Sequence, residues 1–463
     1  MRVTFEIPVL ASALIAGTFA SLYDESDARA NGRFPLAQAV VTAPGESPPR
    51  RVVLRTTFGL VVSEDGGSSF AWACEEALGF SGTWDPPIAL GSSRDVAPGG
   101  ASTLFVGLPT GLRRGPGPCS LEPVKALDGE VVVDLATTRD GARVFGITAT
   151  PTKPGVVVAS KGTSFERLAR GPSDVRFETI EVAPSRQERV YVTGTHDGEG
   201  PRGRFYRSDD GGRTLTETRP KLALDGPLFV SSVDPKDPDR VLVRQLHRQG
   251  SELLLTKDGG KTFETVLHVD GSMTGFALSD DGKTAWAGSG NPKEGLHRSD
   301  DGGATWTRVL DVPVLCLHAV GPKLFVCSNH FLPGGHALLV SDDGGKTARP
   351  ILDFADVKGP VSCDGGPAAS CSTKWPELRT TLVPRPAPPA ADASVADGSV
   401  GAVGYDDGGA PPDAAPGSRA PERASTSRCS CRAIPENSAE MPWFALAVAA
   451  AVGGIRRRKP GSS

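Results

Sequence analysis

Three carboxylates beside one tryptophan have residue types and a spacing that suit chemistry. Glu75, Glu76 and Asp85 lie within eleven residues of one another, and Trp84 precedes Asp85. Two carboxylates roughly 5–10 Å apart can hydrolyse a glycosidic bond, one as acid and the other as base or nucleophile. The indole ring could serve as a platform for a sugar. The interpretation that we favour is a solvated acidic loop whose tryptophan packs on the edge of a sheet.

Histidines in two further stretches could bind a metal or another ligand. His330 and His336 share one loop, and His247 is followed by Arg248. Because a zinc ion needs three or four ligands, two imidazoles are too few, and we expect surface loops without a metal. The sequence predicts no cofactor, since it contains no phosphate-binding glycine loop, Ser-His-Asp phrase or nucleophile elbow.

A short phrase that occurs five times must organise the elements around these residues. Its pattern is Ser/Thr-x-Asp-x-Gly-x-Ser/Thr, followed in three copies by an aromatic residue. Each copy separates two runs of β-type residues, which is typical of a hairpin whose glycines tolerate positive φ. We expect the Asp to accept hydrogen bonds inside its own turn rather than to bind calcium. The residues that carry the pattern are Ser63, Asp65, Gly67, Ser208, Asp210, Gly212, Thr256, Asp258, Gly260, Ser299, Asp301, Gly303, Trp306, Ser341, Asp343 and Gly345.

The spacing of the copies predicts the number of repeated units. The last four copies begin 48, 43 and 42 residues apart, and the gap of 145 residues before them fits three such intervals. We therefore expect two worn copies, near 111 and 160. The second is visible at Val158–Phe165 without its Asp, whereas Gly111–Gly115 shows no such phrase. Seven units of this length, each with four strands, predict an all-β, seven-bladed β-propeller over residues 31–380.

The repeated phrase resembles the Asp-box, or BNR, repeat of sialidases, sortilin-type receptors and related β-propellers. Sialidases bind the substrate carboxylate with three arginines, and they use a tyrosine nucleophile assisted by a glutamate together with an aspartate acid/base. No tyrosine of this chain lies in a phrase that resembles the nucleophile region, and Arg33-Phe34-Pro35 is a faint echo of the first arginine's phrase. We therefore do not expect sialidase activity.

Blade geometry divides the loops between two faces. If the Asp phrases form third-to-fourth turns on one face, the second-to-third turns and the links between blades lie on the opposite face, where we expect any ligand near the central channel. The loops assigned to that face are Glu75–Leu90, Gly194–Arg204, Leu246–Ser251, Ser289–Glu294 and Ser328–His336. The candidate ligand residues on it are Glu75, Glu76, Trp84, Asp85, His247, Arg248, His330 and His336.

Eight cysteines suggest disulfides, because the chain has the features of an exported protein. Their connectivity cannot be derived from the sequence. Cys316 and Cys327 flank one hairpin and could pair. Cys363 and Cys371 are close in the chain and could also pair. The pair Cys74–Cys119 is a weaker suggestion, because these cysteines occupy equivalent places in neighbouring blades.

Both ends of the chain indicate export. Residues 1–30 have the apolar stretch and small residues of a signal peptide. Residues 381–428 are rich in Pro, Ala, Asp, Gly and Ser, which predicts a disordered linker.

Residues 429–463 combine a cysteine motif, a short apolar run and an arginine cluster. This order resembles the myxobacterial C-terminal sorting signal, which implies recognition by a membrane protease and attachment to the cell surface. The alternative is a simple tail anchor with its positive end inside the cell. The residues that carry the resemblance are Cys429, Cys431, Arg456, Arg457 and Arg458.

The sequence therefore predicts a monomeric, exported propeller on the surface or outer membrane of a Gram-negative bacterium, or released from it. A net charge of −4 without a basic stripe argues against a nucleic-acid partner. We expect a non-catalytic binding module for a protein or polysaccharide of the cell envelope, held at the membrane by its C-terminal segment. A glycoside hydrolase is the alternative, and a purely structural role is a third.

Overall fold

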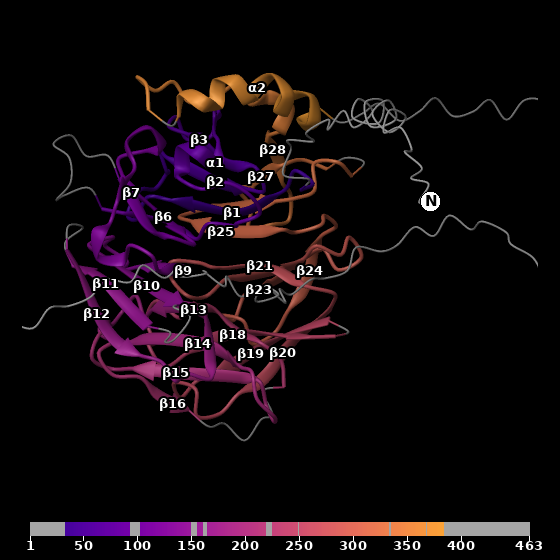
Figure 1. The fold of residues 1–463 in the computed structure, drawn as a ribbon. Helices are drawn as coiled ribbons and strands as arrows, with labels where there is room; N and C mark the ends of the chain where they lie inside the picture. The colour runs from indigo at the N-terminus through magenta and orange to yellow at the C-terminus, as the bar shows by residue number, and fades with distance from the viewer. Residues whose placement is uncertain are drawn as a thin grey trace, which may run out of the picture. The chain divides into compact units, whose positions relative to one another are not determined.

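Seven antiparallel sheets of four strands follow one another along the chain in the computed structural model (Figure 1). The structure describes residues 33–92, 102–149, 155–160, 164–218, 225–248, 250–332, 335–366 and 368–383. The predicted signal peptide, the segment 429–463 and all but the first three residues of the predicted linker lie outside these ranges. Within them, the predicted all-β, seven-bladed propeller is confirmed.

The first four blades are formed by strands β1–β16, with two short 3-10 helices in blade 2 and a four-residue helix between blades 1 and 2. The bounds are β1 (Ala37–Thr42), β2 (Val52–Thr56), β3 (Gly59–Ser63), β4 (Ala71–Ala73), α1 (Glu75–Leu78), β5 (Ile88–Gly91), β6 (Thr103–Leu108), β7 (Gly111–Gly115), η1 (Pro118–Ser120), β8 (Glu122–Pro123), η2 (Lys125–Leu127), β9 (Val131–Thr137), β10 (Arg143–Ala149), β11 (Gly155–Ser160), β12 (Ser164–Arg170), β13 (Val175–Val182), β14 (Val190–His196), β15 (Gly203–Ser208) and β16 (Thr216–Thr218).

Blades 5 to 7 contain strands β17–β28 and are followed by one 3-10 helix and one longer helix. The bounds are β17 (Leu228–Val233), β18 (Val241–His247), β19 (Gly250–Thr256), β20 (Glu264–Asp270), β21 (Met273–Leu278), β22 (Ala285–Ser289), β23 (Leu296–Ser299), β24 (Thr307–Leu310), β25 (Cys316–Val320), β26 (Lys323–Cys327), β27 (Leu338–Ser341), β28 (Arg349–Leu352), η3 (Phe354–Asp356) and α2 (Ala369–Leu382).

The five Asp phrases, which we call the Asp turns, each connect the third and fourth strands of a blade and share one hydrogen-bond pattern. The first hydroxyl donates to Asp Oδ1 at 2.7 or 2.8 Å. The N–H of the second glycine donates to that hydroxyl at 2.7–2.9 Å. The Ser or Thr four residues after the Asp donates its N–H to Oδ1 and its hydroxyl to Oδ2. Every oxygen of the carboxylate is therefore engaged inside the turn.

Two consecutive glycines give the Asp turns their shape. In the turn of blade 6, Gly302 has a φ of 72° and Gly303 a φ of 93°, a region that other residues rarely adopt. The Gly302 N–H donates to the carbonyl of Lys283 at 2.6 Å, which joins the Asp turn to the first-to-second turn of the same blade. Equivalent bonds occur in blades 1, 4 and 5. In these four blades the Asp turn is thus fixed to the first-to-second turn of its own blade.

The hydrogen bonds also hold the carboxylates in their ionised form. In blade 1, hydrogen bonds from Ser69 and Ser63 lower the pKa of Asp65 to about 2. In blade 5, burial raises the pKa of Asp258, but hydrogen bonds from Thr262 and Thr256 outweigh burial and lower this pKa to about 2. Ionisation and turn formation therefore support each other.

The two worn copies differ in outcome. Val158–Phe165 covers the end of β11 and the start of β12, the third and fourth strands of blade 3, as the period predicts, and its central residues 161–163 are outside the described ranges. The expectation of a turn near 111 was wrong, because Gly111–Gly115 is the third strand, β7. The third-to-fourth turn of blade 2 follows it and contains Cys119 in place of an Asp phrase.

The ring is closed without exchanging a strand between the first and last blades. Each of these blades takes its four strands consecutively, β1–β4 and β25–β28. Inner strands β1 and β25 meet at the seam between blades 1 and 7, where Thr42 Oγ1 lies 2.8 Å from His318 Nε2. The rest of the closure comes from residues 357–383, which we call the clasp.

The clasp first pairs with the outer edge of blade 1. The Trp72 N–H of β4 donates to the Gly359 carbonyl at 2.8 Å, and the Val361 N–H donates to the Trp72 carbonyl at 2.7 Å. The Lys358 N–H donates to the Phe70 carbonyl at 2.9 Å. These bonds form a short parallel bridge beside β4, so the chain that has just left blade 7 is held to blade 1.

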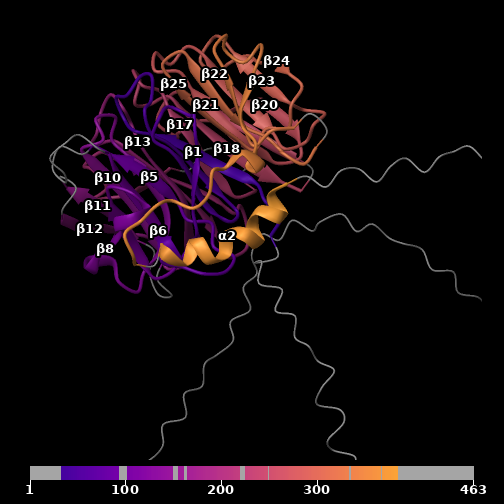
Figure 2. The ribbon, with the colours of Figure 1, turned by 90° about the horizontal axis from the view of Figure 1, so that it is seen from above.

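Helix α2 then crosses the seam, and Figures 1 and 2 show it along the edge of the ring beside the indigo strands of blade 1. The Trp375 ring lies 5.8 Å from that of Trp72, between ring centres, and Lys374 forms an ion pair with Glu76 of α1. A buried apolar cluster joins the clasp to blades 1 and 7, with members that include Val52, Leu54, Phe325, Leu338, Cys371 and Leu382. None of the helices in the described ranges is long and apolar enough to cross a membrane.

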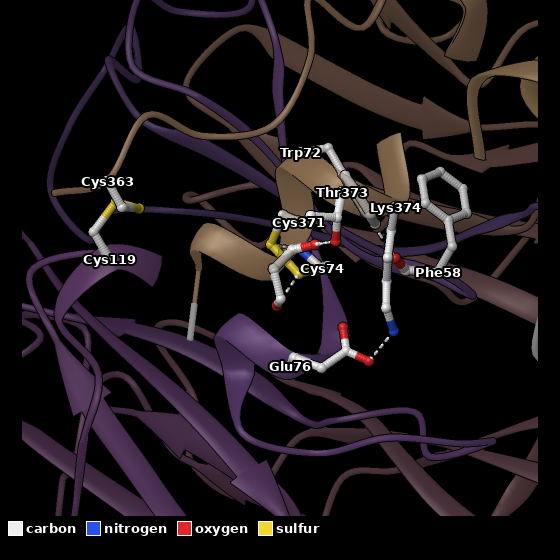
Figure 3. Close-up of a disulfide and its surroundings, with 10 residues drawn as sticks. Phe58, Trp72, Cys74, Glu76, Cys119, Cys363, Cys371, Thr373 and Lys374 are labelled. Atoms are coloured by element: carbon white, nitrogen blue, oxygen red, sulfur yellow. Dashed lines mark hydrogen bonds and ion pairs between the residues drawn. A yellow bond between two sulfur atoms is a disulfide. The ribbon is translucent and has the colours of Figure 1, made fainter. Parts of the chain in front are cut away.

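Two disulfides fix the clasp to blades 1 and 2. The bonds are Cys74–Cys371 and Cys119–Cys363 (Figure 3), and a third, Cys316–Cys327, joins β25 to β26. The expected pair Cys316–Cys327 is thus confirmed. The expected pairs Cys363–Cys371 and Cys74–Cys119 were wrong, because the clasp returns to the first two blades, and nearness in the chain says nothing of that return.

The segment Glu75–Leu90, which we expected to be one long loop, was also assigned incorrectly in part. Glu75–Leu78 forms α1, and Ile88–Leu90 already belongs to β5. The helix is favoured by two acidic residues in its first turn and by Gly79, whose φ of 95° ends it.

The Asp turns predict a specific acid sensitivity. In Asp258→Asn we expect the free energy of unfolding to fall by about 1–2 kcal/mol at pH 7, because the charge-assisted hydrogen bonds weaken. The folded pKa is below the unfolded one, so this stabilisation is complete above about pH 4 and is lost as pH falls toward 2. Denaturant unfolding from pH 2 to 7 measures it. Asp311→Asn, at a carboxylate whose side chain is 80% exposed, is the control, and an equal effect there would contradict the account.

The clasp predicts unequal contributions from the disulfides. Replacing Cys74 and Cys371 by serine opens a loop whose ends are 297 residues apart in sequence. Replacing Cys316 and Cys327 opens a loop whose ends are 11 residues apart. The chain-entropy relation gives the longer closure about 3 kcal/mol more stabilisation. We expect the first double variant to have the lower unfolding temperature by calorimetry. The reverse order would show that the clasp does not hold the ring.

Candidate functional site

The face opposite the Asp turns carries the second-to-third turns, as blade geometry requires. These turns follow β14, β18, β22 and β26, and their described residues are 197–202, 248, 290–295, 328–332 and 335–337. The link from β4 to β5, which contains α1, lies on the same face. We call this surface the ligand face.

The candidate carboxylates of the ligand face are held in separate ion pairs. Glu76 pairs with Lys374 of the clasp (Figure 3). Asp85 accepts a hydrogen bond from Arg33 at 2.7 Å and another from Gln38 at 3.1 Å. Both carboxylates therefore serve to hold segments of the fold together, and they are not arranged as one acid/base pair.

Trp84 is partly buried rather than fully presented to solvent. Its indole N–H donates to the Gly107 carbonyl at 3.0 Å. The ring thus fixes the link between blades 1 and 2 onto blade 2. Glu75, the remaining candidate of this stretch, lies in the first turn of α1.

The structure brings His330 and His336 together around one carboxylate. Asp353 Oδ1 lies 3.2 Å from His330 Nδ1 and 2.9 Å from His336 Nδ1. His330 Nε2 lies 3.2 Å from the Leu382 carbonyl at the end of α2. Both ring nitrogens of His330 therefore face hydrogen-bond acceptors. In the described ranges no group of three or more His, Cys, Asp or Glu side chains could hold a metal ion.

His247 and Arg248 line a surface pocket on the ligand face of blade 5. The pocket has a volume of about 370 Å³, and its other lining residues are Gly250, Glu252 and His268. His247 Nε2 lies 3.3 Å from Glu252 Oε2. The structure thus places these two predicted ligand residues in one pocket.

Two further carboxyls lie on inner strands, where blades surround the central channel. Burial raises the pKa of Asp134 on β9 to about 6, against a hydrogen bond from the Ile180 N–H at 2.9 Å. Burial raises the pKa of Glu181 on β13 to about 8, and the charge of Asp134 adds to this. The side chains of Asp134 and Glu181 are each partly exposed. Protein atoms nevertheless replace most of the water around the two carboxyl groups, and this loss of hydration raises their pKa values. Glu181 therefore holds a proton at neutral pH.

Two other ionisable groups are also perturbed by burial. Burial lowers the pKa of Arg55, and the charges of Asp85 and Asp134 oppose that effect. Burial lowers the pKa of His318 to about 4, so its imidazole is neutral at pH 7 beside Thr42. The channel therefore contains acids, bases and cations in an environment that perturbs them, as binding and catalytic sites do.

Sequence reasoning missed several of these groups. Glu252 and His268 become neighbours through strand register, which pairs them directly between β19 and β20. Asp134 and His318 are the single ionisable residues of apolar strands, whereas Glu181 lies in β13, which also contains Arg176 and Glu178. A polar residue inside such a strand is the available signal, but it does not say which blades meet around it.

Comparison with known families and with curated proteins finds no match to this chain. Solved structures with the same kind of fold include a Niastella koreensis GH74 enzyme, at 14% identity over 67% of this chain and 62% of that one, with a TM-score of 0.34. They also include YCF48 bound to a D1 peptide, at 16% identity, 56% and 79% coverage and a TM-score of 0.39. A third is the Myceliophteria thermophila Cps50 (Swd1) β-propeller domain, at 12% identity, 64% and 94% coverage and a TM-score of 0.43.

These structures are similar to the chain in fold alone. The match to the Niastella koreensis enzyme spans less than two thirds of that protein. By their names, the neighbours comprise an enzyme, a peptide-bound protein and a propeller domain. Function has to be argued from the residues of this chain.

The raised pKa of Glu181 predicts that this residue lowers the free energy of unfolding by an amount that depends on pH. Because the folded pKa of Glu181 is raised to about 8, its penalty is absent below about pH 4.5 and grows until about pH 8. We expect Glu181→Gln to raise the free energy of unfolding by on the order of a few kcal/mol at pH 8.5 and to change it little at pH 4.5. Denaturant unfolding at the two pH values measures this. Glu264→Gln, at an exposed carboxylate paired with Lys257, is the control, and a pH-independent effect of Glu181→Gln would contradict the assignment.

Proposed function

We propose that this chain is an exported, cell-surface binding module without catalysis of its own, which binds a protein or a polysaccharide of the envelope through the ligand face. The observation that carries the proposal is the engagement of Glu76 by Lys374 and of Asp85 by Arg33. A catalytic acid or base must reach the bond that it protonates, whereas these two groups hold the clasp and the N-terminal segment in place. The ligand face is thus rigid, and its candidate carboxylates are committed to structure.

Export is supported by the three disulfides among the described residues. Disulfides persist in oxidising compartments and are rare in the cytosol. The likeness of the Asp turns to Asp-box repeats agrees with a secreted propeller. Attachment to the cell surface rests on the sequence of residues 429–463, which lie outside the described residues, and remains part of the proposal, as does a monomeric state.

A second candidate function is a glycoside hydrolase that works in the channel. It is favoured by one observation, the neighbouring carboxyls Asp134 and Glu181 with pKa values of about 6 and about 8. A carboxyl that keeps its proton at neutral pH can act as a general acid while its neighbour is ionised. The residues are on the inner strands, so a substrate would have to enter the channel mouth.

A binding and release assay separates the two functions. The purified protein is mixed with bacterial and plant polysaccharides, and with purified envelope proteins, and scored for co-sedimentation and for released reducing ends. We expect binding without release, and equal binding by Glu181→Gln, because that residue lies in the channel. Release that Glu181→Gln abolishes would replace the binding module by the hydrolase. Neither binding nor release would contradict both.

A further inference from the structure

The pocket of blade 5 that His247 and Arg248 line is a separate concave site on the ligand face. It is formed where β18 turns into β19, the second-to-third turn of the blade. Its lining residues are His247, Arg248, Gly250, Glu252 and His268, and its volume of about 370 Å³ falls within the range of small-molecule sites. The inference that follows rests on the proposed function and names the class of ligand.

Strand register puts the polar side chains of the pocket on one side of the sheet. His247 pairs with Gly250 between β18 and β19, and Glu252 pairs with His268 between β19 and β20. Directly opposed residues share a face, as do residues two apart on one strand. His247, Glu252 and His268 therefore project together from three adjacent strands.

Gly250 lets the neighbouring strand and the His268 ring approach its backbone closely. A Cβ atom at this position would lie 2.4 Å from the Val269 carbonyl oxygen and 3.2 Å from the His268 ring. Any larger residue would push the ring and the strand away. The lack of a side chain at Gly250 thus allows the His268 ring to lie close to β19.

Charges in the pocket are partly paired and leave one cation for a ligand. Glu252 Oε2 lies 3.3 Å from His247 Nε2, and Asp270 Oδ1 lies 3.7 Å from His268 Nε2. Arg248 is exposed, and the described part of the chain provides it with no hydrogen bond or ion pair. The two imidazoles are therefore held by carboxylates, while the guanidinium is available.

We infer that this pocket binds the carboxylate of an acidic polysaccharide, a uronic acid unit, with Arg248 as its main contact. A guanidinium presents two parallel N–H groups that match a carboxylate, which a neutral sugar lacks. His247 and His268 flank the bound carboxylate, and Glu252 accepts a hydrogen bond from a neighbouring sugar hydroxyl. The rigid sheet holds these groups in place before the ligand arrives.

Calorimetric titration of the full chain with polygalacturonate and with neutral dextran tests the inference. We expect binding of polygalacturonate that weakens about tenfold or more in Arg248→Ala, the loss of one charge-assisted contact. The matched control is Arg202→Ala, an exposed arginine in the equivalent turn of blade 4, which we expect to bind like the unchanged protein.

The outcomes separate this inference from the proposed function. Binding of dextran, or of polygalacturonate with equal strength in Arg248→Ala, overturns the pocket while leaving the binding module intact. Equal weakening in both arginine variants also overturns it, since long-range charge would then explain the effect. If no polysaccharide and no envelope protein binds in either assay, the proposed function fails together with the pocket.

Discussion

A ring of seven wedge-shaped sheets depends on holding the last sheet to the first. Here that role belongs to the clasp, whose backbone pairs with Trp72 on the outer edge of blade 1. The two long-range disulfides and the ion pair between Lys374 and Glu76 lie around the same seam. Because the clasp contacts blades 1, 2 and 7, closure does not require strand exchange, and all seven blades keep their strands in chain order.

The two faces of the ring are stabilised by different means, and this division places function. On one face the Asp turns satisfy their own polar groups and, in four blades, bond to the neighbouring turn through a glycine N–H. That leaves the opposite face free to vary in loop length and residue type, as functional loops on a rigid scaffold do. Of its candidate carboxylates, Glu76 contributes to closure through Lys374, and Asp85 holds the N-terminal segment through Arg33. Other polar side chains of the described residues line the blade 5 pocket or lie on the inner strands.

The repeat, and with it the blade number, could be predicted from sequence because each Asp turn is a local structure. Its internal hydrogen bonds span at most five residues, for example from the Gly303 N–H to Ser299 Oγ and from the Thr305 N–H to Asp301 Oδ1. The clasp could not be predicted in this way, since Cys371 meets Cys74 only after the ring has formed. The same limit applies to the site. His247 and Arg248 are adjacent in sequence, but Glu252 and His268 are brought beside them by strand register. Helix α2 has no strong amphipathic pattern from which the surface that it contacts could be predicted.

Disulfide mapping tests the central claim, closure by the clasp, most directly. The purified protein is digested without reduction, and the linked peptides are identified by mass spectrometry. The account predicts peptides that join Cys74 to Cys371 and Cys119 to Cys363, besides Cys316 to Cys327. Peptides that join Cys363 to Cys371 and Cys74 to Cys119 would contradict it, because the segment after blade 7 would then not be fastened to the first two blades.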